Sequence, residues 1–148
     1  MYKRILVPLD GSELAERALP PAADIARGME AQLWLVRVSL AGEYVFGPGG
    51  TIAPYADEVF EHDRRAAAAY LSEVRARLAR PGLTINSEVL NGPVAETIVD
   101  YARSRQIDLI VMCTHGRSGV SRWVYGSVTD KVLQGAHCPT LIVRGQTT

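Results

Sequence analysis

Short apolar runs alternate with stretches of helical spacing from one end of the chain to the other. Two of the runs, residues 109–112 and 140–143, are continuously apolar, as strands covered on both faces are. Residues 84–90 alternate apolar with polar side chains, which indicates an edge or half-exposed strand. The expected strands are residues 5–7, 33–38, 84–90, 109–112 and 140–143. Because helical segments separate these strands, the pattern predicts an α/β fold: an open, five-stranded parallel sheet with helices on both faces.

Helix start and stop signals divide the remaining segments. Ser12 is a good N-cap for a first helix that we expect to reach Ile25, and the pair Pro20 and Pro21 should kink this helix or start a second one. A third segment should begin at Gly92 and Pro93, with proline at the first helical position. The expected helices are residues 12–25, 56–79, a segment from 92 onward, and 127–135.

The segment at 56–79 is the longest expected helix. We predict that one side of it faces the protein, and that two acid–base pairs at a spacing of four residues support it, Glu61 with Arg65 and Glu73 with Arg77. The expected inward positions are Val59, Ala66, Tyr70, Val74 and Leu78. The preceding segment, residues 39–54, is rich in glycine and proline and too long for an ordinary connection, so we expect it to be functional or mobile.

Composition limits the classes of protein that fit. The 148 residues suit one domain, with 47% hydrophobic and 22% charged residues, and the 16 basic and 16 acidic side chains cancel. This balance argues against a general nucleic-acid binder. We see no signal peptide and no apolar run of about 20 residues, so we expect a cytoplasmic protein that does not span a membrane. Cys113 and Cys138 lie in or beside apolar runs, and we expect both to be buried thiols.

Several nucleotide and hydrolase motifs are absent from the sequence. There is no P-loop, no Gly-x-Gly-x-x-Gly after the first strand and no Gly-x-Ser-x-Gly elbow. The three histidines, His62, His115 and His137, give little support to a hydrolytic triad, and we assign His115 a structural role. No pair of residues stands out as able to activate water or a hydroxyl group, so the sequence favours a protein without catalysis.

A possible phosphate site follows the strand at 109–112. We expect a turn at His115 and Gly116, where glycine lets the backbone come close to a ligand. Gly126 and Ser127 then precede a helix whose N-terminal N–H groups favour an anion. The alternative is a capping box in which Ser127 bonds the N–H of Asp130, and the two interpretations are compatible.

Charged residues near these turns are further candidates. Asp10 ends the first strand, where ligands of open parallel sheets bind, and its carboxylate can accept a hydrogen bond from a ribose hydroxyl or an adenine amino group. The alternative is an aspartate that only shapes the turn. Arg117 and Arg122 can reach phosphate oxygens or simply lie in solvent, and Trp123 is either a packing anchor or a partner contact.

Four motifs together resemble the universal stress protein family over essentially the whole chain. They are residues 5–12, 114–119, 126–129 and 138–143. The ATP-binding branch of this family carries Gly-x-x-Gly, nine residues, then Gly-Ser/Thr, and Gly116, nine residues and Gly126–Ser127 match the second part. The resemblance implies a Rossmann-like sheet of the adenine nucleotide alpha hydrolase type, with strand order 3-2-1-4-5.

The resemblance also implies an adenine pocket between the ends of the first, second and fourth strands. Leu9 and Asp10 would contact ribose and base, Val38 would pack on adenine with Met112 nearby, and the glycines with the following helix would hold the phosphates. The residues carried over are Pro8, Leu9, Asp10, Val38, Met112, Cys113, Gly116, Arg117, Gly126, Ser127, Val128 and Thr129.

The chain departs from the motif at its first glycine, which is Cys113 here. A left-handed backbone at that position would cost about 1–2 kcal/mol for a non-glycine residue. That cost corresponds to roughly a tenfold loss of affinity. An extended backbone would leave only local crowding. In a further alternative, Cys113 is a redox-sensitive lid on the pocket, which requires an exposed thiol of lowered pKa.

The function implied by the resemblance is a stress-response regulator or sensor that binds ATP, ADP or AMP, with Mg²⁺. Two alternatives are a dimeric scaffold of the same fold that binds no nucleotide, and a slow ATPase or autokinase. The apolar strand from Thr140 to Val143 should lie at a sheet edge. We therefore expect a symmetric homodimer in which two such edges meet.

Overall fold

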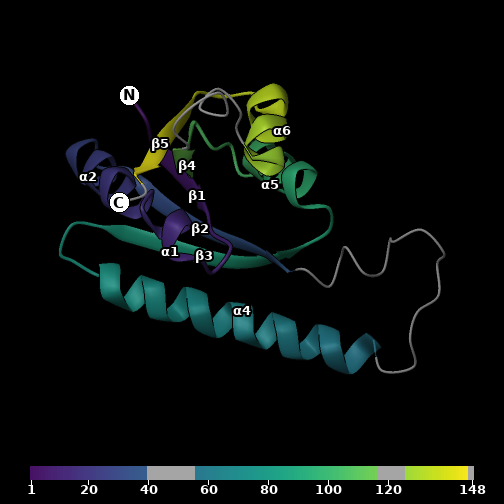
Figure 1. The fold of residues 1–148 in the computed structure, drawn as a ribbon. Helices are drawn as coiled ribbons and strands as arrows, with labels where there is room; N and C mark the ends of the chain where they lie inside the picture. The colour runs from purple at the N-terminus through teal and green to yellow at the C-terminus, as the bar shows by residue number, and fades with distance from the viewer. Residues whose placement is uncertain (40–55, 117–125, 147–148) are drawn as a thin grey trace.

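Five parallel strands form one sheet in the computed structural model, which describes residues 1–39, 56–116 and 126–146. The order β3-β2-β1-β4-β5 is the expected one, and every pairing is parallel (Figure 1). The strands are β1 (Arg4–Pro8), β2 (Gln32–Ser39), β3 (Thr84–Asn91), β4 (Leu109–Gly116) and β5 (Thr140–Gln146). The helices are α1 (Glu13–Glu16), α2 (Leu19–Gly28), α4 (Ala56–Leu78), α5 (Val94–Ser104) and α6 (Ser127–Gly135).

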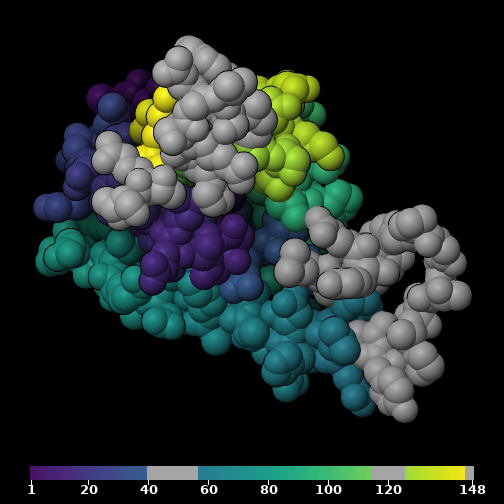
Figure 2. Space-filling view, in the orientation of Figure 1, coloured from purple at the N-terminus to yellow at the C-terminus, as the bar shows by residue number. Residues whose placement is uncertain are grey.

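Helices cover the two faces of the sheet as separate layers. Successive side chains of a strand point to opposite faces, so Ile5 and Val7 pack with α2 and α4, whereas Leu6 packs with α5 and α6. All three side chains are fully buried. The space-filling view shows α4 along one flank of the molecule and α5 with α6 on another (Figure 2). Each face therefore has its own apolar core, and the carboxyl ends of the strands meet between the two layers.

The two strands on the side of the sheet that ends in β5 are longer than the sequence predicts. β4 continues past Met112 to Gly116, and β5 continues to Gln146, because the pairing between them extends to Gly116 opposite Gln146. The turn expected at His115 and Gly116 is therefore wrong: both residues are in the strand. Polar side chains at the end of β4 concealed the extra length.

The first expected helix is two helices. Ser12 caps α1, its hydroxyl accepting a hydrogen bond from the Ala15 N–H at 3.1 Å. A second helix begins at Leu19, so Pro20 and Pro21 lie in its first turn, where a missing N–H removes no helical hydrogen bond. The prediction of a second start is confirmed, although this helix ends at Gly28 rather than at Ile25.

The inward face of α4 is confirmed at Tyr70, Val74 and Leu78, which pack in the core, but not at the other two predicted positions. Val59 is 59% exposed and Ala66 is exposed, whereas Ala67, Leu71 and Val74 are buried. The prediction for Val59 and Ala66 is wrong, because the alanine-rich middle of this helix gives apolar positions on more than one side.

The ion pairs of α4 are partly as predicted. Arg65 Nε lies 3.1 Å from Glu61 Oε1, as expected. Arg77 instead binds Glu16 of α1, with 2.5 Å between Arg77 Nη2 and Glu16 Oε1. The predicted pair of Arg77 with Glu73 is wrong, because a carboxylate from another element reaches Arg77.

α5 begins one position later than expected, since Pro93 is its N-cap residue rather than its first helical residue. Gly92, just before it, has a φ of +132°, a conformation that suits glycine. Among the described residues, no helix is long and apolar enough to cross a membrane. Of the loop expected at residues 39–54, Ser39 belongs to β2, and the rest lies outside the described residues together with Arg117, Arg122 and Trp123.

Candidate functional site

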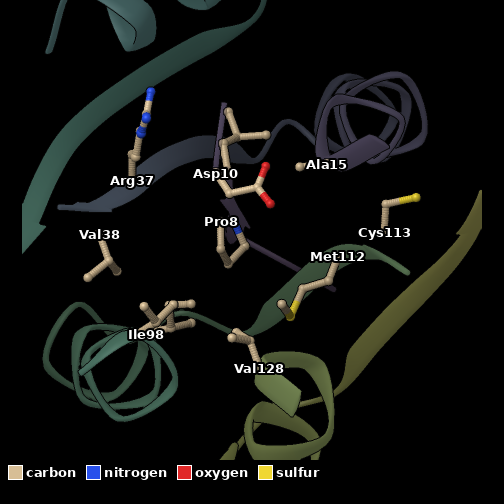
Figure 3. A pocket seen from close by; sticks show the side chains of 11 residues that line it. Pro8, Asp10, Ala15, Arg37, Val38, Ile98, Met112, Cys113 and Val128 are labelled. Carbon is tan, nitrogen blue, oxygen red and sulfur yellow. The ribbon is translucent and has the colours of Figure 1, made fainter. Parts of the chain in front are cut away.

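A cavity of about 380 Å³ opens at the carboxyl ends of β1, β2 and β4 (Figure 3). The sequence led us to expect a ligand site at this edge of the sheet. The lining residues are Pro8, Leu9, Asp10, Ala15, Arg37, Val38, Val94, Ile98, Met112, Cys113 and Val128. The volume falls in the range of about 300–1,000 Å³ that small-molecule sites occupy.

Apolar side chains form the floor and one wall of this cavity. Val38 comes from β2, Ile98 from α5, Met112 from β4 and Val128 from α6, and the first three are buried. They converge from four elements on one space (Figure 3). Such a wall can accept a flat apolar or aromatic ring without leaving a polar group of the protein unpaired.

Asp10 brings a carboxylate to the opposite side of the cavity. Its Oδ1 accepts hydrogen bonds from the Ser12 backbone N–H at 2.8 Å and from the Ser12 hydroxyl at 2.5 Å. The turn-shaping role considered from the sequence is therefore present. The other carboxylate oxygen accepts no hydrogen bond from the described residues, and the carboxyl group faces the cavity (Figure 3). Asp10 can thus shape the turn and accept one further hydrogen bond.

The N-terminus of α6 lies at the rim of the cavity, because Val128 of its first turn is a lining residue. Gly126 is the N-cap residue, and no side chain from the described part of the chain caps the helix. The Asp130 N–H bonds the carbonyl of Gly126 at 2.9 Å, so the alternative of a capping box from Ser127 is excluded. The first N–H groups of this helix have no partner within it, and such groups favour an anion.

Gly126 itself is not required by the folded chain. Its φ of −60° is open to any residue, and a Cβ built on it would meet no described atom within 4 Å. By contrast, a Cβ on Gly145 would clash with Leu14 Cδ1, so tight packing surrounds that glycine. Among the described residues, none fills the space beside Gly126.

Cys113 lies in the extended backbone of β4, paired with Val143 of β5. The left-handed alternative considered for this position is therefore excluded, because the positive φ values of non-glycine residues within the described chain are those of Glu30 and Gln106. Burial raises the pKa of the Cys113 thiol, and the opposing effect of Arg17 is smaller. A thiol kept protonated in this way argues against a redox-sensitive lid.

Sequence comparison decides the family. The universal stress protein family model matches residues 1–144. The chain belongs to the universal stress protein family. A universal stress protein of Methanocaldococcus jannaschii is 33% identical over 144 residues, covering 97% of this chain and 83% of the relative. Universal stress protein YxiE of Bacillus subtilis is 31% identical over 153 residues, covering 97% of this chain and 100% of the relative.

Solved structures of universal stress proteins share the fold. One from Methanocaldococcus jannaschii superposes with a TM-score of 0.80 at 25% identity, covering 100% of this chain and 99% of the other. A universal stress protein in complex with cAMP gives a TM-score of 0.70 at 24% identity, covering 96% and 97%. One from Archaeoglobus fulgidus in complex with dAMP gives 0.60 at 23% identity, covering 95% and 97%.

The structure brings together most of the residues named from the family motifs. Those that line the cavity are Pro8, Leu9, Asp10, Val38, Met112, Cys113 and Val128. Gly126, Ser127 and Thr129 belong to the α6 N-terminus at its rim, and Gly116 ends β4. Arg117 lies outside the described residues, as do the side chains of His115 and Gln146.

Four lining residues were not foreseen: Ala15, Arg37, Val94 and Ile98. Val94 and Ile98 stand four residues apart at the start of α5, a spacing that places them on one side of the helix. Arg37 directly precedes Val38 near the end of β2, but its neighbourhood in sequence does not show that its side chain reaches the site. Its side chain lies on the other face of the sheet from that of Val38, and no motif residue indicates that it lines the cavity.

Proposed function

We propose that this universal stress protein binds an adenine nucleotide, ATP with ADP or AMP as alternatives, in the cavity at the ends of β1, β2 and β4. One observation carries the proposal: an apolar cavity holds a carboxylate on one side and the uncapped N-terminus of a helix at its rim. This arrangement is complementary to a ligand with a flat ring, hydroxyl or amino donors, and an anionic tail.

Each part of the site would bind one part of the nucleotide. Val38, Met112 and Val128 would pack against adenine, and the free oxygen of Asp10 would accept a hydrogen bond from a ribose hydroxyl or the adenine amino group. The N–H groups at the start of α6 would bind phosphate. Helix-end contacts contribute only about 0.3–1 kcal/mol each, so useful affinity also needs the apolar cavity.

Two relatives of this fold support an adenine nucleotide, since one is known in complex with cAMP and another with dAMP. The described residues hold no cluster of three or more histidine, cysteine, aspartate or glutamate side chains that could bind a metal ion. Mg²⁺ would therefore arrive with the phosphates, which is the usual way nucleotide sites bind it.

The biological role we propose is a cytoplasmic regulator or sensor of stress that signals through its nucleotide-bound state. We propose no turnover, because Asp10 is the single acidic residue among the described residues that line the cavity, and it already bonds Ser12. Slow ATP hydrolysis is the alternative, and release of inorganic phosphate in proportion to the protein would establish it.

A homodimer through β5 is part of the same proposal. β5 lies at one edge of the sheet, and its Leu141 is 39% exposed. A bare apolar edge favours pairing with another strand, and a two-fold axis would close that pairing. Light scattering at micromolar concentration should give the mass of two chains, and the mass of one chain would contradict the dimer.

Calorimetric titration with Mg-ATP tests the nucleotide site. Gly126→Leu would place a side chain where we expect phosphate. Gly28→Leu is a matched control, because a Cβ on either glycine meets no described atom within 4 Å. We expect micromolar binding to the wild type and to Gly28→Leu, and at least a tenfold loss in Gly126→Leu. Equal affinity in all three proteins would contradict a phosphate site at α6.

A further inference from the structure

Arg37 is a charged residue of the cavity that the proposed nucleotide contacts leave without a role. It lies near the end of β2 and is half-buried. Within the described residues its guanidinium makes neither a hydrogen bond nor an ion pair, although Asp10 lines the same cavity. Figure 3 shows its side chain directed away from Met112 and Val128. Its position calls for an explanation other than direct contact with the ligand.

One face of the guanidinium lies against Gly11. A Cβ built on Gly11 would stand 3.0, 3.2 and 3.3 Å from Arg37 Nη1, Cζ and Nη2. Three nearly equal distances mean that the planar group lies flat over this position. Gly11 also has a φ of +89°, which side chains rarely adopt. The glycine therefore provides both the turn and the room for Arg37.

The other contact of the guanidinium is an aromatic ring that is itself held in place. Arg37 Cζ lies 5.1 Å from the centroid of the Tyr70 ring on α4, within the range of a cation–π contact. The Tyr70 hydroxyl donates to Glu16 Oε2 at 3.1 Å, and Arg77 binds the other oxygen of Glu16. Since Glu16 belongs to α1, these contacts tie α4 to the helix that follows the Asp10 turn.

Gly11 is the middle residue of that turn. It stands between Asp10 and Ser12. The backbone N–H and the hydroxyl of Ser12 both donate a hydrogen bond to Asp10 Oδ1. A displacement of Gly11 would change the separation of these two residues and turn the carboxylate away from the cavity. The guanidinium lies against Gly11 and contacts the Tyr70 ring, so such a displacement would have to move it as well.

We propose that Arg37 is a positioning residue for the nucleotide site: lying flat against Gly11 and in contact with the Tyr70 ring, it holds the turn that aims Asp10 at the ligand. The proposal rests on the proposed function for its ligand, but the holding of the turn is a property of the free protein. The planar shape of the guanidinium is the essential feature. Lysine keeps the charge without the plane, so Arg37→Lys should behave like Arg37→Ala.

The free protein gives the first test, by amide hydrogen exchange of Ser12 measured by NMR. In the wild type the Ser12 N–H is bonded to Asp10, and we expect its exchange to be at least fivefold faster in both Arg37→Ala and Arg37→Lys. Arg75→Ala is the control, because Arg75 is an exposed arginine in the last turn of α4. Unchanged exchange in Arg37→Ala would overturn the proposal whether or not a nucleotide binds.

Nucleotide analogues give the second test and separate positioning from a general effect of charge. Asp10→Asn first identifies the group that Asp10 contacts. The analogue 2′,3′-dideoxy-ATP lacks the ribose hydroxyls, and purine riboside triphosphate lacks the adenine amino group. Asp10→Asn should lose the wild-type preference for ATP over the analogue that lacks the contacted group. Arg37→Ala and Arg37→Lys should then bind ATP about tenfold more weakly and that analogue within twofold of the wild type. A uniform loss for all three ligands, or full recovery in Arg37→Lys, would overturn the proposal. If the wild type binds none of them, the proposed function fails and Ser12 exchange alone decides the role of Arg37.

Discussion

Replacing Cys113 by glycine restores the residue that the family motif has at this position, and the structure predicts that the change is harmful. Cys113 lies within β4 in extended conformation and is half-buried. Glycine inside a strand lowers stability by about 0.5–1 kcal/mol relative to alanine. Loss of the half-buried side chain adds about 0.5–1 kcal/mol. We therefore expect the free energy of unfolding to fall by about 1–2 kcal/mol, which lowers Tm by about 3–6 °C in a chain of this size.

The same substitution should leave nucleotide affinity nearly unchanged. A left-handed backbone at Cys113 would have predicted roughly a tenfold gain on changing it to glycine, through release of about 1–2 kcal/mol of strain. Since the backbone is extended and paired with Val143, there is no such strain to release. Only local crowding changes, and we expect less than a threefold difference in the Kd for Mg-ATP.

Urea denaturation and calorimetric titration of three proteins measure both effects. Cys113→Ala is the matched control, because it removes the thiol and keeps a Cβ on the strand. Its stability should lie about midway between the wild type and Cys113→Gly. A Cys113→Gly protein that is as stable as the wild type and binds tenfold more tightly would refute the reasoning.

Two further predictions concern stability. Gly92→Ala should lower the free energy of unfolding by about 1–3 kcal/mol, because Gly92 has a φ of +132° and a Cβ there would lie 2.6 Å from Thr97 Oγ1. In the same urea titrations the control Gly28→Ala should be neutral or stabilising, because a Cβ on Gly28 meets no described atom within 4 Å. Equal stability of the two variants would contradict the strain assigned to Gly92. Burial, with the charges of Glu16 and Glu88, raises the pKa values of Tyr70 and Tyr101 above those of the unfolded chain. The neutral phenols therefore stabilise the fold below about pH 10, and this stabilisation is lost as the pH rises further. In an ultraviolet titration these two tyrosines should ionise later than in urea, and Tyr70→Phe should remove one late transition, whereas early ionisation of both would contradict the assigned contacts.

The fold could be predicted from the sequence where one physical signal dominated. Buried parallel strands read as apolar runs, and the five runs give the five strands. Their ends could not be read in the same way, because residues 113–116 of β4 are held by pairing with β5 and not by apolar side chains. Alanines on several sides of α4 likewise gave no unique inward face, and packing against the sheet selected Ala67, Leu71 and Val74.

The candidate site, too, could be predicted from the sequence only in part. Asp10 follows the end of β1, Val38 lies near the end of β2 and Met112 lies within β4. Parallel strands bring such positions to one edge of the sheet. Arg37 could not be found in this way, since its place depends on Gly11 and on Tyr70, which is distant in sequence. The capping box failed for a local reason: Gly126 occupies the N-cap position, one residue earlier than the serine that the pattern favoured.

The central claim is that one cavity and one helix N-terminus together form a single nucleotide site. Calorimetric titration of the wild-type protein with Mg-ATP, with adenosine, and with ATP in the presence of inorganic tripolyphosphate tests it most directly. The account predicts micromolar binding of ATP, at least tenfold weaker binding of adenosine, and competition by tripolyphosphate. Absence of heat with both ATP and adenosine would contradict it and favour a dimeric scaffold that binds no nucleotide.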